Sequence, residues 1–413
     1  MDAAVAERVR RVVGCIVGGA VGDAVGGRAE GSLGGHSANP LQLGELEISD
    51  DTQFTLATIE ALLAGDDGVR VTVDPERLAA TFATWHRARR FRGVGSSTLK
   101  ALTELEAGVH WSFVGAKGER AAGNGAAMRA APLAFVLDPD VDADRALLRD
   151  CCRITHHNDE AYVGALAMVR AIRLAHAGEA RGGAGDLQRV AEPLPDSLVR
   201  DRLLELARLP IWSGYTEAVA IAGTSGWVAD SVPLALFAAS RADTTPESFD
   251  AMLETIVAHG GDTDTIASMA GQVLGARGGV GCVPRHRLAA MLASHAVFLA
   301  ASRRRRRGRN TCTSPEPGPR DEADEPRRRT RLNSTWTRAA CAASAGGLPS
   351  QLPEGPKMGD EDDLNHWLRR HSSDLYMSDP EVDVEDRPRG ARDSTAATTA
   401  CSARSPPVRS RVF

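Results

Sequence analysis

The chain has 413 residues, a formal net charge of −5 at neutral pH and an aromatic content of only 4%. The acidic balance argues against a nucleic-acid-binding core, which normally carries a basic face. The scarcity of aromatic residues and the alanine-rich stretches 161–177 and 232–239 favour helices over sheets, so we expect an all-α fold.

A glycine stripe marks the first predicted helix. Gly14, Gly18 and Gly22 recur every four residues along an apolar segment. Each glycine costs a helix roughly 1 kcal/mol relative to alanine, so a closely packed partner must compensate. The apolar run then breaks between residues 22 and 31, which places Asp23 and Glu30 on a helix end and a glycine-rich loop.

Two acidic segments far apart in the sequence are the strongest functional signal. Their hard oxygen donors are Ser49, Asp50, Asp51, Asp262, Asp264 and Thr265. Donors of this kind suit Mg²⁺ or Mn²⁺ far better than zinc. Neither segment alone could surround a pair of metal ions, but the two together could.

A helix is predicted after each acidic segment. Leu56, Ile59 and Leu63 follow the first at helical spacing, and the apolar residues of 266–274 follow the second in the same way. Asp, Ser and Thr in such positions are ordinary helix caps. Capping accounts for one carboxylate per helix start. It does not account for the paired carboxylates in each segment, which repel one another unless a cation or proton intervenes.

The end of the chain differs in composition. Hydrophobic patterning stops near residue 302 at the arginine run 303–307, and eleven of the 21 prolines follow residue 300. We therefore expect one catalytic core over 1–302 and a disordered tail over 303–413. The arginine run is either a patch for polyanions, nucleic acid included, or solvated charge. The tail itself is either a genuine extension or the product of a misjudged reading frame.

The seven cysteines form no CxxC pair and no zinc pattern. Cys151 and Cys152 are adjacent in a predicted helix, where we expect buried free thiols. The apolar N-terminal stretch is short and stops at Asp23, which argues against a signal peptide or a membrane span. We therefore expect a cytoplasmic monomer.

Six segments, taken in order, resemble the ADP-ribosylglycohydrolase family. They are Gly18-x-x-x-Gly22-Asp23-Ala24-x-Gly26-x-x-x-Glu30, Ser49-Asp50-Asp51-Thr52, Gly123-Asn124-Gly125-Ala126-Ala127-Met128-Arg129-x-x-Pro132-Leu133, Thr155-His156, Ser225-Gly226-Trp227-Val228-x-Asp230-Ser231 and Gly260-Gly261-Asp262-Thr263-Asp264-Thr265. Each segment alone is a weak signal, but all six in family order are specific. The resemblance covers roughly residues 8–300 and implies a compact, all-helical domain with a two-metal site in a central cleft.

The resemblance also implies a reaction. A hydrolase of this family removes ADP-ribose from a modified side chain, or a related acceptor, by cleaving the bond at C1 of the distal ribose. The acidic segments would hold two Mg²⁺ or Mn²⁺ ions, with one aspartate bridging them. Glu30 matches the family's catalytic or gating glutamate.

The expected substrate contacts come from the same resemblance. Gly123, Asn124 and Gly125 would offer amide donors to the diphosphate at a helix start. His156 matches a position that lines the ADP-ribose pocket, although a histidine in isolation is more often structural. Asp23 either supports the metal ligands or is simply a residue at the helix end.

Two other functions remain open. The first is a binding or structural protein on the same fold, which loss of metal ligands would favour; here every ligand position keeps an oxygen donor. The second is a two-metal phosphoesterase that uses the same carboxylates on another ester. The acceptor linkage, arginine, serine or another, cannot be read from the sequence.

Overall fold

The structure of the protein is a computed structural model that describes residues 3–30, 46–66 and 71–294. All of them belong to one compact unit, Met1–Met377. The predicted tail 303–413 lies outside the described residues, so the domain boundary at residue 302 stays a prediction.

Helices dominate the described residues, which confirms the predicted all-α fold. The α-helices are α1 (Ala3–Gly26), α2 (Asp50–Leu63), α3 (Pro75–Arg87), α4 (Ser96–Glu106), α5 (Asp142–Arg153), α6 (Asp159–His176), α7 (Ala184–Ala191), α8 (Leu198–Ala207), α9 (Tyr215–Ala222), α10 (Val228–Arg241), α11 (Pro246–His259) and α12 (Thr263–Gly278). Residues 285–294 are also helical. The short 3₁₀ turns are η1 (Glu119–Ala121), η2 (Asn124–Ala126), η3 (Ala131–Phe135) and η4 (Val280–Cys282). The strands β1 (Ala116–Lys117) and β2 (His156–His157) form one parallel pair, with Ala116 opposite His156.

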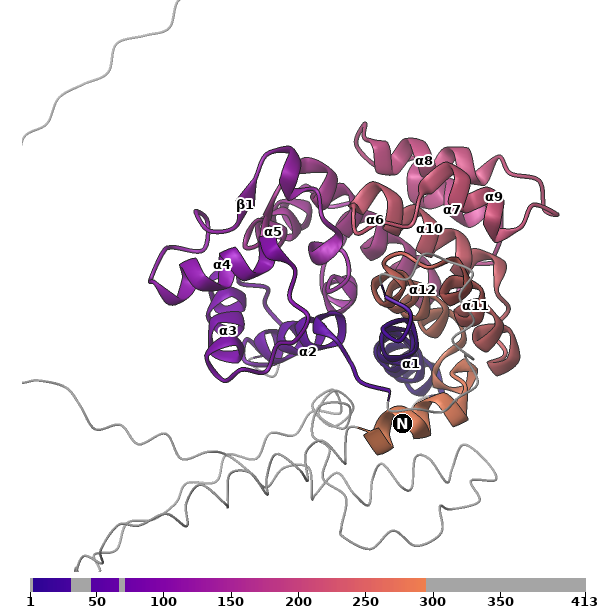
Figure 1. Cartoon of the computed structure of the whole chain (residues 1–413), viewed down its shortest axis with the longest axis horizontal. Coiled ribbons are helices and arrows are strands. Elements are labelled where there is room, and N and C mark those ends of the chain that lie inside the picture. Colours follow the sequence, from indigo (N-terminus) through magenta and orange to yellow (C-terminus); the bar gives the residue numbers. More distant parts are fainter. Residues whose placement is uncertain (1–2, 31–45, 67–70, 295–413) are drawn as a thin grey trace, which may run out of the picture. The chain divides into compact units, whose positions relative to one another are not determined.

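The predicted partner of the glycine stripe is α12. A methyl group on Gly14 would lie 2.4 Å from the carbonyl oxygen of Gly275, and one on Gly18 would lie 2.5 Å from that of Gly271. The two helices therefore touch backbone to backbone, which compensates for the helix cost of the glycines. Figure 1 shows α1 and α12 side by side. We call this contact the glycine seam.

The seam continues to the ends of both helices that carry acidic residues. A methyl group on Gly26 would lie 2.2 Å from the carbonyl oxygen of Thr263, and the Thr263 hydroxyl donates to the Gly26 carbonyl at 2.7 Å. Helix α1 thus runs to Gly26, four residues beyond the expected break, and Asp23 lies in its last turn. The end of α1 is held against the start of α12.

The remaining core is built by apolar faces that pack around α12. Helices α6 and α10 both contact it, and each covers one of the alanine-rich stretches that the composition predicted as helical. Tyr162, Phe237 and Phe249 are among the largest fully buried side chains.

Within the described ranges, no helix has both the length and the apolarity to cross a bilayer.

Helix α2 buries Leu56, as its spacing predicted, but not the whole of the predicted face. Ile59 and Leu63 are only half-buried, whereas Phe54, Ala57 and Ala61 are buried. The reason is the aromatic contact made by Phe54, whose ring lies 4.9 Å from that of Phe82 on α3, edge to face. This packing rotates the buried face toward α3.

Candidate metal centre

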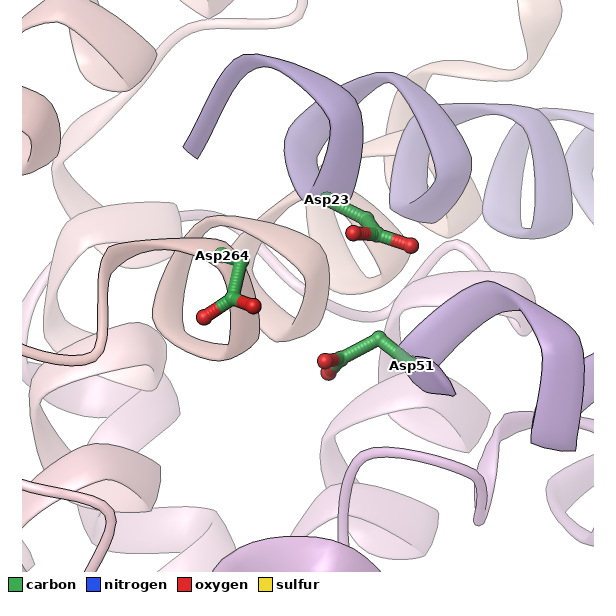
Figure 2. Close-up of side chains that lie close together, drawn as sticks. All are labelled: Asp23, Asp51 and Asp264. Carbon is green, nitrogen blue, oxygen red and sulfur yellow. The ribbon is translucent and has the colours of Figure 1, made fainter. Parts of the chain in front are cut away.

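Three helix ends bring three carboxylates together. Asp23 comes from the last turn of α1, Asp51 from the first turn of α2 and Asp264 from the first turn of α12. One carboxylate oxygen of each lies within 4.8 Å of the others, and all three residues are buried. Figure 2 shows the three side chains converging from separate helices.

Asp23 also fixes the start of α2. Its carboxylate accepts hydrogen bonds from the backbone N–H of Ser49 at 3.0 Å and from that of Thr52 at 3.1 Å. The Thr52 hydroxyl donates to it at 2.5 Å. These donors are the unpaired groups of a helix N-terminus. Asp23 therefore supports the ligand-bearing turn of α2, and it also belongs to the carboxylate group itself.

A second carboxylate group shares one member with the first. Glu30, Asp262 and Asp264 also offer oxygens within 4.8 Å of one another. Asp264 thus belongs to both groups, as the bridging role implied by the family resemblance would require. Glu30 is exposed, and the charge of Asp264, followed by partial burial, raises its pKa.

Crowding and burial make these acids weak. Burial, with the charges of Asp23 and Asp264, raises the pKa of Asp50 to about 8. Burial and the adjacent Asp262 raise the pKa of Asp264 to about 7. For Asp23 burial prevails over its hydrogen bonds and raises the pKa to about 6. Burial is also the main cause that raises the pKa values of Asp51 and Asp262.

Asp51 shows that these residues fit a cation. Its Oδ2 accepts from the hydroxyls of Ser49 and Thr265, each at 3.1 Å. Its Oδ1 is buried and has no hydrogen-bond partner among the described residues. A buried carboxylate oxygen without a partner is costly, and a cation offsets that cost together with the repulsion of the neighbouring carboxylates. The donors are all oxygens, which suit a hard divalent ion.

The expected ligands do not all occupy the same place. Asp51, Asp262 and Asp264 lie within the two groups. Ser49 and Thr265 lie against Asp51 through their hydroxyls. Asp50 is nine-tenths buried but belongs to neither group among the described residues; a methyl group on Gly93 would lie 3.6 Å from its Oδ1.

Asn124 uses its donors inside the protein. Its side-chain amide donates to Asp262 at 2.5 Å and to the Ser231 hydroxyl at 3.1 Å. Its backbone N–H donates to the carbonyl of Gly226 at 3.1 Å. These donors therefore orient Asp262 and the loop beside it in this structure, and the expected contact of Asn124 with a diphosphate stays a prediction.

His156 lies behind the turn rather than in an open pocket. It is 3% exposed, and its Nδ1 lies 2.7 Å from the Thr155 hydroxyl. Methyl groups on Gly123 and Gly125 would lie 3.2 and 2.8 Å from its ring. Burial lowers its pKa to about 3, so the ring is neutral. Glycine at 123 and 125 is what lets the turn approach this ring.

Arg129 is a structural residue whose role no sequence pattern predicted. Its guanidinium is buried and donates to the carbonyls of Gly125 and Cys151 and, at 2.8 Å, to the Thr155 hydroxyl. It lies 5.2 Å from the centre of the Phe82 ring. Burial lowers its pKa to about 10, so the group stays charged at neutral pH. Only its place in the motif that starts at Gly123 could have suggested this link.

The buried thiols follow the prediction. Cys151 and Cys152 are buried and free on α5. Burial raises the pKa of Cys152 to about 12, which keeps this thiol protonated and unreactive.

Known proteins resemble this chain in sequence and in overall fold. The ADP-ribosylglycohydrolase family model matches residues 4–311. The ADP-ribosylhydrolase ARH3 of Danio rerio is 29% identical over an alignment of 277 residues, and the match covers 58% of this chain and 72% of the relative. An uncharacterized protein of Archaeoglobus fulgidus is 30% identical over 246 residues, 58% of this chain and 75% of the relative. A solved chain described as an ADP-ribosylglycohydrolase-related protein complex superposes with a TM-score of 0.53 at 25% identity, over 70% of this chain and 98% of that one.

Proposed function

The chain belongs to the ADP-ribosylglycohydrolase family, and from that premise we propose that it is a metal-dependent hydrolase of ADP-ribosyl linkages. Family membership supports hydrolysis of ADP-ribose linkages in general. The finer proposal is that the enzyme releases ADP-ribose from a modified protein side chain, or from a related ADP-ribosyl acceptor, by cleaving the bond at C1 of the distal ribose.

The observation that carries the proposal is the position of Asp264 in both carboxylate groups. We infer that Asp23, Asp51 and Asp264 would hold one ion and that Glu30, Asp262 and Asp264 would hold a second. Two Mg²⁺ or Mn²⁺ ions so held would bind vicinal ribose hydroxyls and lower the pKa of a coordinated water.

The chain's own residues supply the remaining chemistry. Cleavage at C1 passes through an oxocarbenium-like centre, which nearby carboxylate oxygens stabilise. Glu30 lies at the exposed edge of the cluster with a raised pKa, so its carboxylate can accept a proton from the attacking water. Asn124 holds Asp262 in place through its side-chain amide. The buried glycine seam behind Asp23 and Asp264 keeps the carboxylates from separating.

The test is turnover of purified protein with Mg²⁺ or Mn²⁺ on a panel of arginine- and serine-linked ADP-ribosyl substrates, with product analysis. We expect intact ADP-ribose, and no product from an Asp264→Asn control. Release of AMP or ribose phosphate would instead identify a phosphoesterase. Binding of ADP-ribose without turnover on any linkage would identify a binding protein on this fold.

A further inference from the structure

Four arginines lie close together at the end of α3 and on the segment that joins it to α4. We call Arg87, Arg89, Arg90 and Arg92 the arginine ridge. All four are exposed, and among the described residues two carboxylates, those of Glu47 and Glu60, pair with them. Arg92 pairs with Glu47 at 3.0 Å, and Arg90 lies 3.9 Å from Glu60. The ridge therefore presents net positive charge on an otherwise acidic chain.

The ridge is held in place by aromatic packing beneath it. Phe91 stacks on Phe54 of α2 with ring centres 3.9 Å apart and planes inclined by 8°. The Arg90 guanidinium lies 5.1 Å from the centre of the Trp85 ring. The backbone N–H of Arg92 donates to the side chain of Gln53 at 2.7 Å. These contacts reduce the ordering cost that flexible surface arginines normally impose on binding.

Arg89 occupies an unusual backbone position. Its φ of +54° is the only positive value for a residue other than glycine among the described residues. It follows the C-cap of α3, where glycine is the common residue because a side chain is strained in this conformation. Within the described ranges the Arg89 side chain forms no ion pair. Among the described residues Arg89 is thus a cation without an ion pair, at a position where local backbone preference favours glycine.

The ridge ends beside Asp50, the chain neighbour of Asp51 in the first carboxylate group. Gly93 follows Arg92, and a methyl group on Gly93 would lie 3.6 Å from Oδ1 of Asp50. Four residues of extended chain span at most about 14 Å. The ridge therefore lies within reach of residues that flank a side chain whose ribose is bound at the carboxylates.

We propose that the arginine ridge binds an acidic segment of the modified polypeptide, within about four residues of the ADP-ribosylated side chain. This inference rests on the proposed function and adds a preference for the sequence around the modification. The ridge already pairs with carboxylates, those of Glu47 and Glu60. Its aromatic rings lie under the arginines, with Trp85 only 7% exposed, so they do not offer the stacking surface by which single-stranded nucleic acids are bound.

The test uses two ADP-ribosylated peptides that differ only in flanking Glu or Gln residues, together with a small ADP-ribosyl acceptor that lacks flanks. We expect wild type to prefer the acidic peptide through a lower KM, with the preference weakening as salt increases. Arg89→Gly should raise KM for the acidic peptide by up to about fivefold, the range of one exposed ion pair. The same variant should leave the neutral peptide and the small acceptor unchanged.

The variants are chosen so that folding does not confuse the result. Glycine adopts the backbone conformation at 89 without strain, so Arg89→Gly should keep its melting temperature. Arg89→Glu should shift the preference to a peptide with Lys flanks. Arg208→Gln, which removes an exposed arginine at the end of α8, should change nothing.

Three outcomes would overturn the inference. They are equal KM values for acidic and neutral peptides in wild type, an equal loss on all substrates in Arg89→Gly, and displacement of the variant-sensitive signal by an oligonucleotide but not by an acidic peptide. Fluorescence anisotropy of the labelled peptides measures the flank preference without turnover. A protein that binds the acidic peptide but never releases ADP-ribose would therefore refute the proposed function and leave the ridge supported.

Discussion

The Thr265 hydroxyl donates a hydrogen bond to Oδ2 of Asp51 at 3.1 Å, although the two residues are 214 positions apart. This bond joins the first turn of α12 to the first turn of α2. It leaves Oδ1 of Asp51 buried without a hydrogen-bond partner among the described residues. The two acidic segments therefore face one another, and their contact leaves one oxygen available for a cation.

Asp264→Asn should be the most damaging single substitution for activity and should leave the protein folded. The variant removes the carboxylate that belongs to both groups, so the loss of metal affinity should exceed the roughly 10–100-fold typical of residues that only support a ligand. The backbone bond from Thr265 to Oδ1 can still form with an amide oxygen. Calorimetric titration with Mg²⁺ and thermal melts with and without metal provide the measurement. Equal stabilisation of both proteins by metal would contradict this role.

Asn124→Ala should weaken metal binding without touching a ligand directly. The substitution removes the 2.5 Å hydrogen bond that orients Asp262, and we expect a loss of about 10–100-fold in metal affinity. Ser231→Ala is the matched control, because it removes the longer bond at 3.1 Å from the same amide and the Ser231 bond to the Trp227 carbonyl, but leaves the bond to Asp262 in place. If the two variants bind Mg²⁺ equally well, Asn124 does not act through Asp262.

Glu30→Gln should reduce turnover by about 10²–10⁴-fold, since it removes the charge that can accept a proton. Because Glu30 lies within the second carboxylate group, a smaller decrease in metal affinity should accompany the loss. Single-turnover rates at saturating Mg²⁺ separate the two effects. A rate near that of wild type under those conditions would remove Glu30 from the mechanism.

Arg129→Met should destabilise the protein and displace the Gly123–Gly125 turn. The change leaves the buried Gly125 and Cys151 carbonyls without their donor, at about 1–3 kcal/mol for each group left unpaired. The Thr155 hydroxyl loses one partner and keeps His156 Nδ1. Thermal melts should show a decrease of several degrees. Arg129→Lys should restore the charge but not the fork of donors, so it should recover stability only in part. Full recovery would mean that charge alone matters.

The stability of the metal-free protein should decrease as the pH rises from about 6.5 to 8. The pKa values of Asp264 and Asp50 are raised to about 7 and about 8, so the folded state keeps protons that the unfolded chain has lost. His156 has the opposite effect, since its pKa is lowered to about 3, but only below its unfolded value of about 6.5. Melting temperatures in EDTA and in Mg²⁺ across this range provide the test. Metal should flatten the decrease, and parallel curves would exclude the carboxylates as its cause.

Local sequence patterns predicted those parts of the site whose residue composition is unusual within a single segment. We could predict the paired carboxylates at 50–51 and 262–264 because adjacent like charges repel one another. We could predict a partner helix for the glycine repeat because glycine alone disfavours a helix. The contacts of Asp23 were not readable, because they depend on where α1 ends relative to α2. The buried guanidinium of Arg129 links Gly125, Cys151 and Thr155, and no periodicity in one segment encodes such a set.

The segment 91–93 was missed for a related reason. Phe91 and Gly93 carry no catalytic chemistry, and nothing in their spacing indicates a site. Their place beside Asp50 follows from the stacking of Phe91 on Phe54, a contact between the α3–α4 loop and helix α2. The rotation of α2 that leaves Ile59 half-buried depends on the same aromatic packing. Tertiary contacts of this kind override the local spacing from which the helix face was predicted.

The glycine seam sets the distance between the carboxylates of Asp23 and Asp264. The backbones of α1 and α12 are in direct contact at Gly18 and Gly271. Because no side chains lie between them there, none can change conformation to accommodate a displacement of one helix. A methyl group at Gly14 lies nine residues, about 13 Å along the helix, from Asp23, yet it would have to push the whole of α1 away from α12. Because Asp23 moves with α1 and Asp264 with α12, a change this remote would alter the fit for the ion while every ligand stays in place. Selectivity among divalent ions of different radius should therefore be sensitive to substitutions far from any oxygen donor.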